Sequence, residues 1–268
     1  MKKGIVLEGG ALRAIFSSGV CDALLEQDVM PDYLVGVSAG IAYGVSYLSR
    51  QPRRNLKVVT TYAPDKRYMG MRNLADKDNR CYFGLKFAYD TIPNQVEAVV
   101  TNLNTGKAEY FPVPRRDRYS TLLQATCAMP LMFPIFHLGG QPYLDGGIAD
   151  AIPWKHALEQ GCDRLLVVLT HPRDYVRKSD PMQKLLHRTY RDYPNFLHVM
   201  EHRAHVYNEN REELFQLERQ GKVKVILPDS TMGVSRTERD PEKLRLLWAK
   251  GYQMAVDRME ELKDYFTP

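Results

Sequence analysis

Gly36-Val37-Ser38-Ala39-Gly40 is the stretch of this 268-residue chain that decides the fold. The run Tyr33 to Val37 has the apolar character of a buried strand, and the small and apolar residues from Ala39 to about Leu48 predict a helix. A serine between a strand and a helix stands on a sharp turn that exposes its hydroxyl, and flanking glycines let the backbone crowd without Cβ clashes. The pattern therefore predicts a nucleophilic Ser38. The alternative is a tight turn that needs small residues only for helix–sheet packing.

The segment before this motif predicts a second loop beside it. Lys3 to Leu7 is a short buried strand, Glu8 to Arg13 is a loop rich in small residues, and Ala14 to Gln27 has apolar residues at helical spacing. Because the ends of neighbouring parallel strands are adjacent, this loop can lie next to Ser38 and offer its backbone N–H groups to an oxyanion. A nucleotide-phosphate loop is the alternative, but the chain has neither G-x-G-x-x-G nor Gly-Lys-Ser/Thr here.

A third motif, Leu144-Asp145-Gly146-Gly147, places an aspartate where a strand ends. A serine hydroxyl is a poor nucleophile until a base takes its proton, and a desolvated carboxylate at hydrogen-bond distance can do so. We therefore predict Asp145 as the general base.

The order strand, loop, helix, strand, helix at the start of the chain is typical of a parallel sheet covered by helices. We expect a three-layer α/β/α fold with a mainly parallel sheet, formed by one domain over residues 1–268. Its core motifs lie in residues 4–170, and residues 171–268 complete or cover the sheet. Further strands are expected at 96–101, 108–113, 136–138, 142–144, 165–169 and 223–227, and further helices at 120–128, 153–161, 195–220 and from 240 onward. Residues 53–94 are expected to form a helix and loops over the sheet, where Met69 and Met71 fill core gaps or line an acyl channel.

Together the three motifs resemble the patatin-like phospholipase family, which is related to cytosolic phospholipase A2. The signature of that family is D-G-G-G-x-R-G, then G-x-S-x-G, then D-G-G or D-G-A. This chain has E-G-G-A-L-R-A at Glu8–Ala14, G-V-S-A-G at Gly36–Gly40 and D-G-G at Asp145–Gly147. The resemblance implies a serine acyl hydrolase that cleaves lipid esters, such as phospholipids or lysophospholipids, through a Ser–Asp dyad and an acyl-enzyme, without a cofactor.

Carried over residue by residue, the resemblance implies that Ser38 is the nucleophile and Asp145 the general base. The implied oxyanion hole consists of backbone amides at Gly9, Gly10, Ala11 and Ala39. Arg13 matches the arginine of the family signature and either braces the loop or meets a phosphate. The other motif positions are Gly36, Gly40, Gly146 and Gly147.

Three positions depart from the signature. Ala11 and Ala14 stand where the family has glycine, and Glu8 stands where it has aspartate. An alanine costs on the order of 1 kcal/mol wherever the loop needs a positive φ. The alternative function is therefore a catalytically weak or inactive protein that binds lipids or acyl groups on the same scaffold.

A Ser–His–Asp triad is a second mechanistic alternative. The order Ser38, Asp145, His171 is the order found in α/β-hydrolases. Against it, those enzymes usually place several strands before the nucleophile, and their oxyanion loop is not the first turn of the chain. We expect no metal site, because His187, His198, His202 and His205 do not form His-Glu-x-x-His.

The composition and net charge indicate which classes of partner to expect. The formal net charge of +5 allows peripheral contact with an anionic membrane surface, and the cluster Arg115–Arg118 is a solvated loop or a headgroup contact. No nucleic-acid module accompanies these charges, so nucleic acid is not expected. No apolar stretch reaches the ~20 residues of a membrane span, so we expect a cytoplasmic protein or one attached only to a membrane surface. The cysteines Cys21, Cys81, Cys127 and Cys162 are expected to be reduced. The sequence leaves the oligomeric state open.

Overall fold

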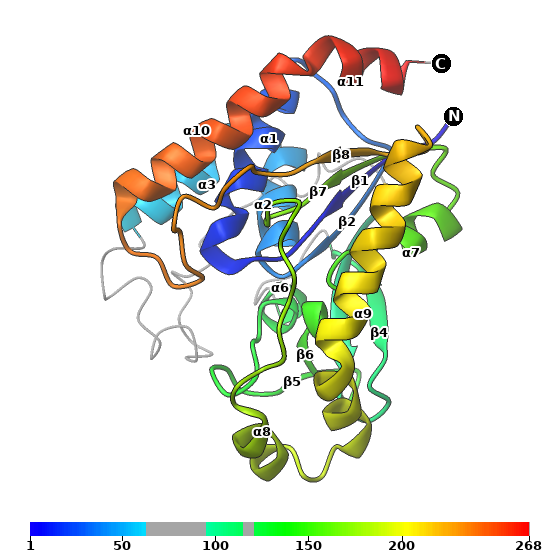
Figure 1. The fold of residues 1–268 in the computed structure, drawn as a ribbon, viewed down its shortest axis with the longest axis vertical. Helices are drawn as coiled ribbons and strands as arrows, with labels where there is room; N and C mark the ends of the chain where they lie inside the picture. The colour runs from blue at the N-terminus through cyan, green and yellow to red at the C-terminus, as the bar shows by residue number, and fades with distance from the viewer. Residues whose placement is uncertain (63–94, 115–120, 268) are drawn as a thin grey trace.

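An eight-stranded sheet runs through the centre of the protein in the computed structural model, which describes residues 1–62, 95–114 and 121–267 (Figure 1). The strands are β1 (Lys3–Leu7), β2 (Tyr33–Val37), β3 (Gln95–Asn102), β4 (Ala108–Pro112), β5 (Phe136–Leu138), β6 (Gln141–Asp145), β7 (Arg164–Val168) and β8 (Lys224–Ile226). Their order is β5-β6-β3-β2-β1-β7-β8, and β4 pairs with β3 outside this path. The strands β3, β2, β1, β7 and β8 are parallel, whereas β4, β5 and β6 pair antiparallel.

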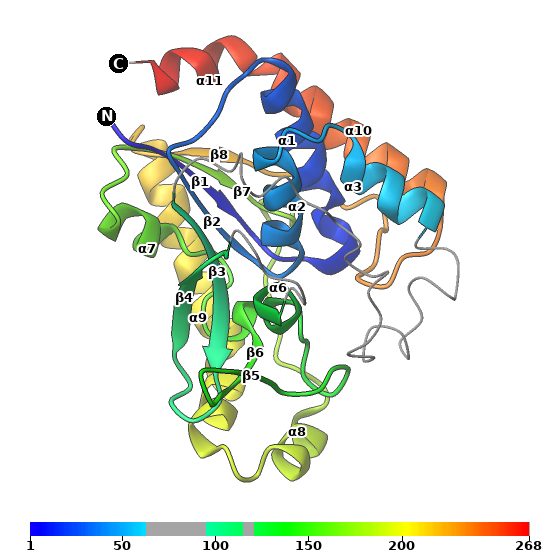
Figure 2. The same ribbon diagram turned by 180° about the vertical axis from the view of Figure 1, so that it is seen from behind.

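The helices are α1 (Ile15–Glu26), α2 (Ala39–Leu48), α3 (Arg54–Lys57), α6 (Thr121–Thr126), α7 (Trp154–Glu159), α8 (Gln183–Thr189), α9 (Pro194–Arg219), α10 (Pro241–Asp257) and α11 (Met259–Phe266). Shorter helical turns are η1 (Ala11–Ala14), η2 (Val58–Tyr62) and η4 (Gly146–Ile148). In Figures 1 and 2 the sheet lies between a layer that contains α1, α2 and α10 and a layer that contains α7 and α9. The predicted α/β/α fold with a mainly parallel sheet is confirmed.

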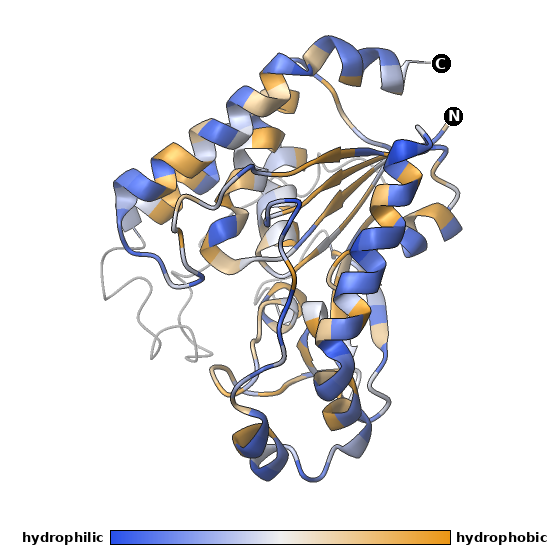
Figure 3. Cartoon of the chain, in the orientation of Figure 1, coloured by the Kyte–Doolittle hydropathy of each residue, from blue (hydrophilic) through white to orange (hydrophobic). Residues whose placement is uncertain are grey.

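Two apolar cores hold these layers together, because successive side chains of a strand point to opposite faces of the sheet. Ile5 and Leu7 of β1 pack with α1, α2 and α10, whereas Val6 between them packs on the face that α7 and α9 cover. Figure 3 shows the apolar strands at the centre and the polar outer surface of α9. A third core, around Leu144 of β6, packs against α8 and the first half of α9.

The position of the site depends on β2 and β6, which both pair with the same edge of β3. Residues 97–99 of β3 pair with both β2 and β4, and residues 100 and 101 pair with both β4 and β6. Since a strand has two edges, β4 occupies one of them along its length, and β2 and β6 follow each other on the other. Val37 pairs with Val99 and Asp145 pairs with Val100, so the carboxyl ends of β2 and β6 meet.

Several expected elements differ from the observed ones. The closing helix is split at Arg258 into α10 and α11, and α8 lies in a segment for which no helix was predicted. Of the segment 53–94, the structure describes α3 and η2, whereas Met69, Met71 and Cys81 lie outside the described residues, as does the cluster Arg115–Arg118. The described cysteines Cys21, Cys127 and Cys162 are free thiols. Within the described ranges, no helix has the length and apolar character to cross a bilayer.

Candidate active site

Ser38 occupies the sharp turn between β2 and α2. Its backbone has φ 54° and ψ −131°, a strained conformation that costs about 1–3 kcal/mol for a residue with a Cβ. The turn is held by Thr126 of α6, whose hydroxyl accepts the Ser38 N–H at 2.9 Å and donates to the carbonyl of Val99. Thr126 thus joins the backbone of Ser38 to β3, which holds the turn against the sheet.

Asp145 lies at the end of β6, opposite this turn, and is only 6% exposed. Its backbone N–H donates to the carbonyl of Ala128 at 2.9 Å, and the hydroxyl of Thr101 donates to its carbonyl at 2.9 Å. Its carboxylate Oδ1 accepts the N–H of Gly147 at 2.8 Å. At Gly146 the chain passes so close to β3 that a Cβ would lie 2.1 Å from the Val99 carbonyl oxygen, so this position requires glycine.

The environment of Asp145 makes its carboxylate a stronger base. Burial raises the pKa of this carboxyl above its usual value of 3.8. Hydrogen bonds from the Gly147 N–H and from the Ser38 side chain oppose that rise, and so do the charges of Arg203 and Arg236. The Ser38 hydroxyl is thus in contact with a carboxylate that holds a proton more readily than an exposed one.

The loop after β1 lies directly against Ser38. A Cβ on Gly9 would lie 3.0 Å from the Cβ of Ser38, and a Cβ on Gly40 would lie 2.6 Å from the carbonyl oxygen of Leu7. No described residue accepts a hydrogen bond from the N–H of Gly9 or Gly10. Ala39 is the first residue of α2, where a helix has no internal acceptor for its N–H. The structure thus brings Gly9, Gly10 and Ala39 together beside Ser38.

Glu8 fastens this loop to the rest of the sheet. The side chain is 1% exposed, and its Oε2 accepts from the backbone N–H and the hydroxyl of Thr170, which follows β7. Its Oε1 accepts from the hydroxyl of Tyr207 on α9. The glutamate found here in place of aspartate thus joins the loop after β1 to the end of β7 and to α9. The contact between Tyr207 and Glu8 was not predicted, because no sequence motif around residue 207 indicates it.

Arg13 and His171 form a pair behind the same loop. Nη2 of Arg13 lies 3.0 Å from Nε2 of His171, which must accept, since a guanidinium only donates. The His171 ring stacks on Tyr175, with ring centroids 3.6 Å apart. Burial and then the charges of Arg13 and other arginines lower the pKa of His171 to about 3. The hydrogen bond thus connects Arg13, at the end of the loop, with His171, whose Nε2 is engaged in it.

The charges of two further arginines, Arg203 and Arg236, affect Asp145, and that of a third, Arg177, affects Arg203; no sequence motif marks any of the three. Arg203 of α9 donates from Nε to the carbonyl of Gly147 at 3.0 Å, and the charge of Arg236 lowers the pKa of Asp145. Burial lowers the pKa of Arg203 to about 9, and the charge of Arg177 adds to this effect. No described residue accepts a hydrogen bond from the buried Nε and Nη1 of Arg177.

Arg177 and Arg203 also line a pocket of about 320 Å³ that borders Gly147. The acidic side chains Glu159, Glu209 and Glu213 line it as well, so its charge is mixed. Cys127 contacts the Ser38 side chain, and burial raises the pKa of its thiol, so it stays protonated.

Ala11 and Ala14, which stand where the family signature has glycine, differ in backbone conformation. Ala11 has φ +49°, whereas Ala14 has φ −65°. We expect Ala11→Gly to raise the free energy of unfolding by about 1 kcal/mol, because it relieves a left-handed conformation. The matched change Ala14→Gly should lower it by about 0.5–1 kcal/mol, because it adds backbone freedom in a helical turn. Urea unfolding measures both, and changes of equal sign would contradict this account of the loop.

The N-terminal and C-terminal parts of the chain match different family models. Residues 5–93 and 89–158 match the family model described as patatin-like phospholipase, and residues 193–267 match a domain of unknown function, DUF6363. A curated protein of Escherichia coli strain K12, described as uncharacterized protein YjjU, is 30% identical over 188 residues. That alignment covers 63% of this chain and 52% of the relative, so the chain matches about half of that protein. The crystal structure of VipD from Legionella pneumophila superposes with a TM-score of 0.48 at 14% identity, covering 97% of this chain and 67% of VipD.

Proposed function

The chain belongs to the patatin-like phospholipase family, as the three motifs indicated, and from this premise we propose that it is a serine acyl hydrolase of lipid carboxyl esters. We propose Ser38 as the nucleophile and Asp145 as the general base. The observation that carries the proposal is the contact between the Ser38 side chain and the buried Asp145 carboxylate, at the point where β2 and β6 meet on the edge of β3. Neither the dyad nor the substrate depends on a cofactor in this proposal.

In the proposed reaction, Ser38 Oγ attacks the ester carbonyl while Asp145 accepts the hydroxyl proton. The negative charge that develops on the carbonyl oxygen is stabilised by the N–H groups of Gly9, Gly10 and Ala39, for which no described residue is an acceptor, with the N–H of Ala11 adjacent. Asp145 then gives its proton to the leaving alcohol, which leaves an acyl group on Ser38. A water molecule, deprotonated by Asp145, attacks this acyl-enzyme, and the fatty acid departs as Ser38 regains a proton.

We propose phospholipids or lysophospholipids as the substrates, rather than neutral esters, because the charges of two guanidinium groups reach Asp145. The charges of Arg203 and Arg236 lower the pKa of the Asp145 carboxyl, and the charge of Arg177 lowers the pKa of Arg203. Among the described residues, none of these three forms an ion pair within 4.0 Å of a carboxylate. Guanidinium groups bind phosphate strongly, so charges left unpaired beside the reacting groups favour a substrate with a phosphate.

This proposal is tested by comparing a phospholipid with a neutral diacylglycerol in the same mixed micelles, with fatty-acid release as the readout. Arg236→Gln should raise KM for the phospholipid about fivefold, as expected from an exposed ion pair worth about 1 kcal/mol, and leave KM for the neutral ester unchanged. Arg239→Gln is the matched control, because it removes an exposed arginine of the same loop that is not among the charges acting on Asp145. Equal effects on both substrates would contradict a role in phosphate binding.

The C-terminal region belongs to the same catalytic domain in our proposal. β8 extends the sheet beside β7, α10 packs along α1, and Tyr207 of α9 binds Glu8. We also propose that the protein acts at the surface of an anionic membrane, in keeping with its net charge of +5.

A second candidate is a lipid- or acyl-binding protein with weak or no turnover. The observation that favours it is the positive φ of Ala11, which strains the oxyanion loop where the family signature has glycine. The micelle assay separates the two candidates, because a binding protein releases little or no fatty acid from either substrate.

A further inference from the structure

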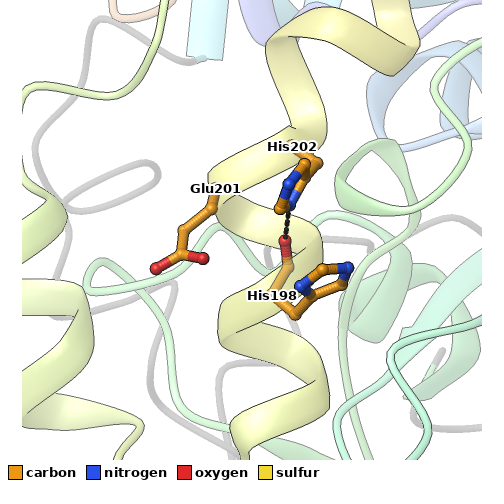
Figure 4. A group of neighbouring side chains, drawn as sticks. All are labelled: His198, Glu201 and His202. Carbon is orange, nitrogen blue, oxygen red and sulfur yellow. Dashed lines mark hydrogen bonds between the residues drawn. The ribbon is translucent and has the colours of Figure 1, made fainter.

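The first half of α9 carries a cluster of metal-ligand side chains on one side of the helix. His198, Glu201 and His202 lie at positions i, i+3 and i+4, which are neighbours on a helix surface (Figure 4). One ligand atom from each of them, a ring nitrogen or a carboxylate oxygen, lies within 4.8 Å of the other two. All three side chains are exposed, so an ion can reach them from solvent.

A hydrogen bond from one ring nitrogen of His202 leaves its other ring nitrogen available to bind a metal ion. Its Nδ1 lies 2.8 Å from the backbone carbonyl of His198, shown by the dashed line in Figure 4. A carbonyl oxygen can only accept, so Nδ1 carries the hydrogen of this bond, and the lone pair of the neutral ring is on Nε2. This is the arrangement that metal-binding histidines usually have, in which the second ring nitrogen donates to a carbonyl or a carboxylate.

A third histidine orients the carboxylate. Nε2 of His187 on α8 lies 2.8 Å from Oε1 of Glu201. The position of α8 is itself fixed, because Leu186 is buried in the same apolar core as Phe196 and Met200 of α9. The cluster thus joins side chains of two packed helices, and His187 holds Glu201 in the way that outer partners hold metal-binding carboxylates.

We propose that His198, Glu201 and His202 bind one divalent transition-metal ion, with Zn²⁺ as the best match. Two imidazoles and one carboxylate are ligands that Zn²⁺ accepts at about 2.0–2.2 Å, whereas Ca²⁺ and Mg²⁺ require oxygen ligands. Small rotations of exposed side chains are enough to bring the three ligand atoms to these distances. A water molecule completes the tetrahedral coordination, as in other sites with three protein ligands.

The sequence carries this cluster as His-x-x-Glu-His, the reverse of the His-Glu-x-x-His order whose absence led us to expect no metal. Both orders place two histidines four residues apart on one face of a helix, so the pair of imidazoles available for binding is the same. The inference rests on α8 and α9 alone and is independent of the proposed acyl hydrolase activity.

The test is Zn²⁺ titration of the metal-free full-length protein, with a chromophoric chelator as competitor. We expect one Zn²⁺ per chain with a dissociation constant in the micromolar range. His198→Ala and His202→Ala should each weaken binding by at least about 10-fold, because they remove proposed ligands and the loss of an outer partner alone costs about 10- to 100-fold. His205→Ala is the matched control, since His205 is an exposed histidine of the same helix that pairs with Glu209 outside the cluster, and it should bind as the wild type does.

Two results would overturn the proposal: no stoichiometric binding by the wild type, or an equal loss of affinity in His205→Ala. Because all the replaced side chains are exposed, the variants should melt at the wild-type temperature when no metal is present. With Zn²⁺ added, the wild type and His205→Ala should melt at a higher temperature, and the two cluster variants should not. A loss of fatty-acid release in any of these variants plays no part in this test.

Discussion

Ser38→Ala is expected to lower the turnover of a lipid ester by at least about 10⁴-fold, because it removes the atom that carries the acyl group. The alanine keeps a Cβ at the same strained φ, so the free energy of unfolding should change by no more than about 0.5 kcal/mol. The loss is measured as fatty-acid release from phospholipid micelles, with urea unfolding as the check on folding. Activity within tenfold of the wild type would rule out Ser38 as the nucleophile.

A second serine supplies the control. Ser17 on α1 is fully buried, and its hydroxyl has no hydrogen-bond partner among the residues that the structure describes. Ser17→Ala removes the same atom from a buried site outside the candidate site, so it should leave turnover unchanged. A comparable loss of activity in both variants would point to a general disturbance of the fold.

Asp145→Asn is expected to lower turnover by about 10²- to 10⁴-fold, the usual contribution of a general base. The amide oxygen of asparagine can still accept the Gly147 N–H, so the turn at Gly146 should survive. In the wild type, activity should fall as the pH decreases through a pKa that lies above the usual value of 3.8, because the protonated carboxyl cannot accept a proton. This acidic limb should disappear from the residual activity of the variant.

The same substitution should change stability in the opposite direction to activity. Because the pKa of Asp145 is higher in the folded than in the unfolded protein, the folded state binds more protons between these values, and stability falls as the pH rises through them. At neutral pH, Asp145→Asn should therefore raise the free energy of unfolding, by about 1.4 kcal/mol for each unit by which the pKa is raised. Urea unfolding of both proteins at acidic and neutral pH isolates this contribution, and a variant less stable than the wild type at neutral pH would contradict it.

Much of the fold could be predicted because its determinants are local. The buried strands β1, β2 and β7 are short apolar runs, and the turn residues Asn104-Thr105-Gly106 between the strands expected at 96–101 and 108–113 favour the antiparallel pair of β3 and β4. The helix α8 was missed because it has few buried positions, of which Leu186 is one. The break between α10 and α11 at Arg258 leaves no mark in the apolar pattern.

The candidate site could be predicted only in part. Sequence order suggested that the loop at Gly9 and the turn at Ser38 are adjacent, because both follow parallel strands. It could not show that β6 continues the edge of β3 beyond β2, which brings Asp145 to Ser38. Tyr207 and Arg203 reach the site from α9, and their positions depend on tertiary packing alone.

His171 shows how sequence order alone can mislead. The order Ser38, Asp145, His171 fits a triad, but the folded chain places Nε2 of His171 against Arg13 and its ring against Tyr175. With its pKa lowered to about 3, this histidine is neutral at physiological pH. We therefore expect it to support the oxyanion loop through Arg13 rather than to move protons.

The rate at which a fluorophosphonate labels the protein tests the dyad most directly, since the reagent reports activation of the serine without requiring a lipid substrate. We expect the wild type to be labelled at Ser38, as located by tandem mass spectrometry, and His171→Ala to be labelled at a similar rate. Asp145→Asn should be labelled at least about 100-fold more slowly. If His171→Ala were as slow as Asp145→Asn, or if the label were on another residue, the account of a Ser38–Asp145 dyad would be wrong.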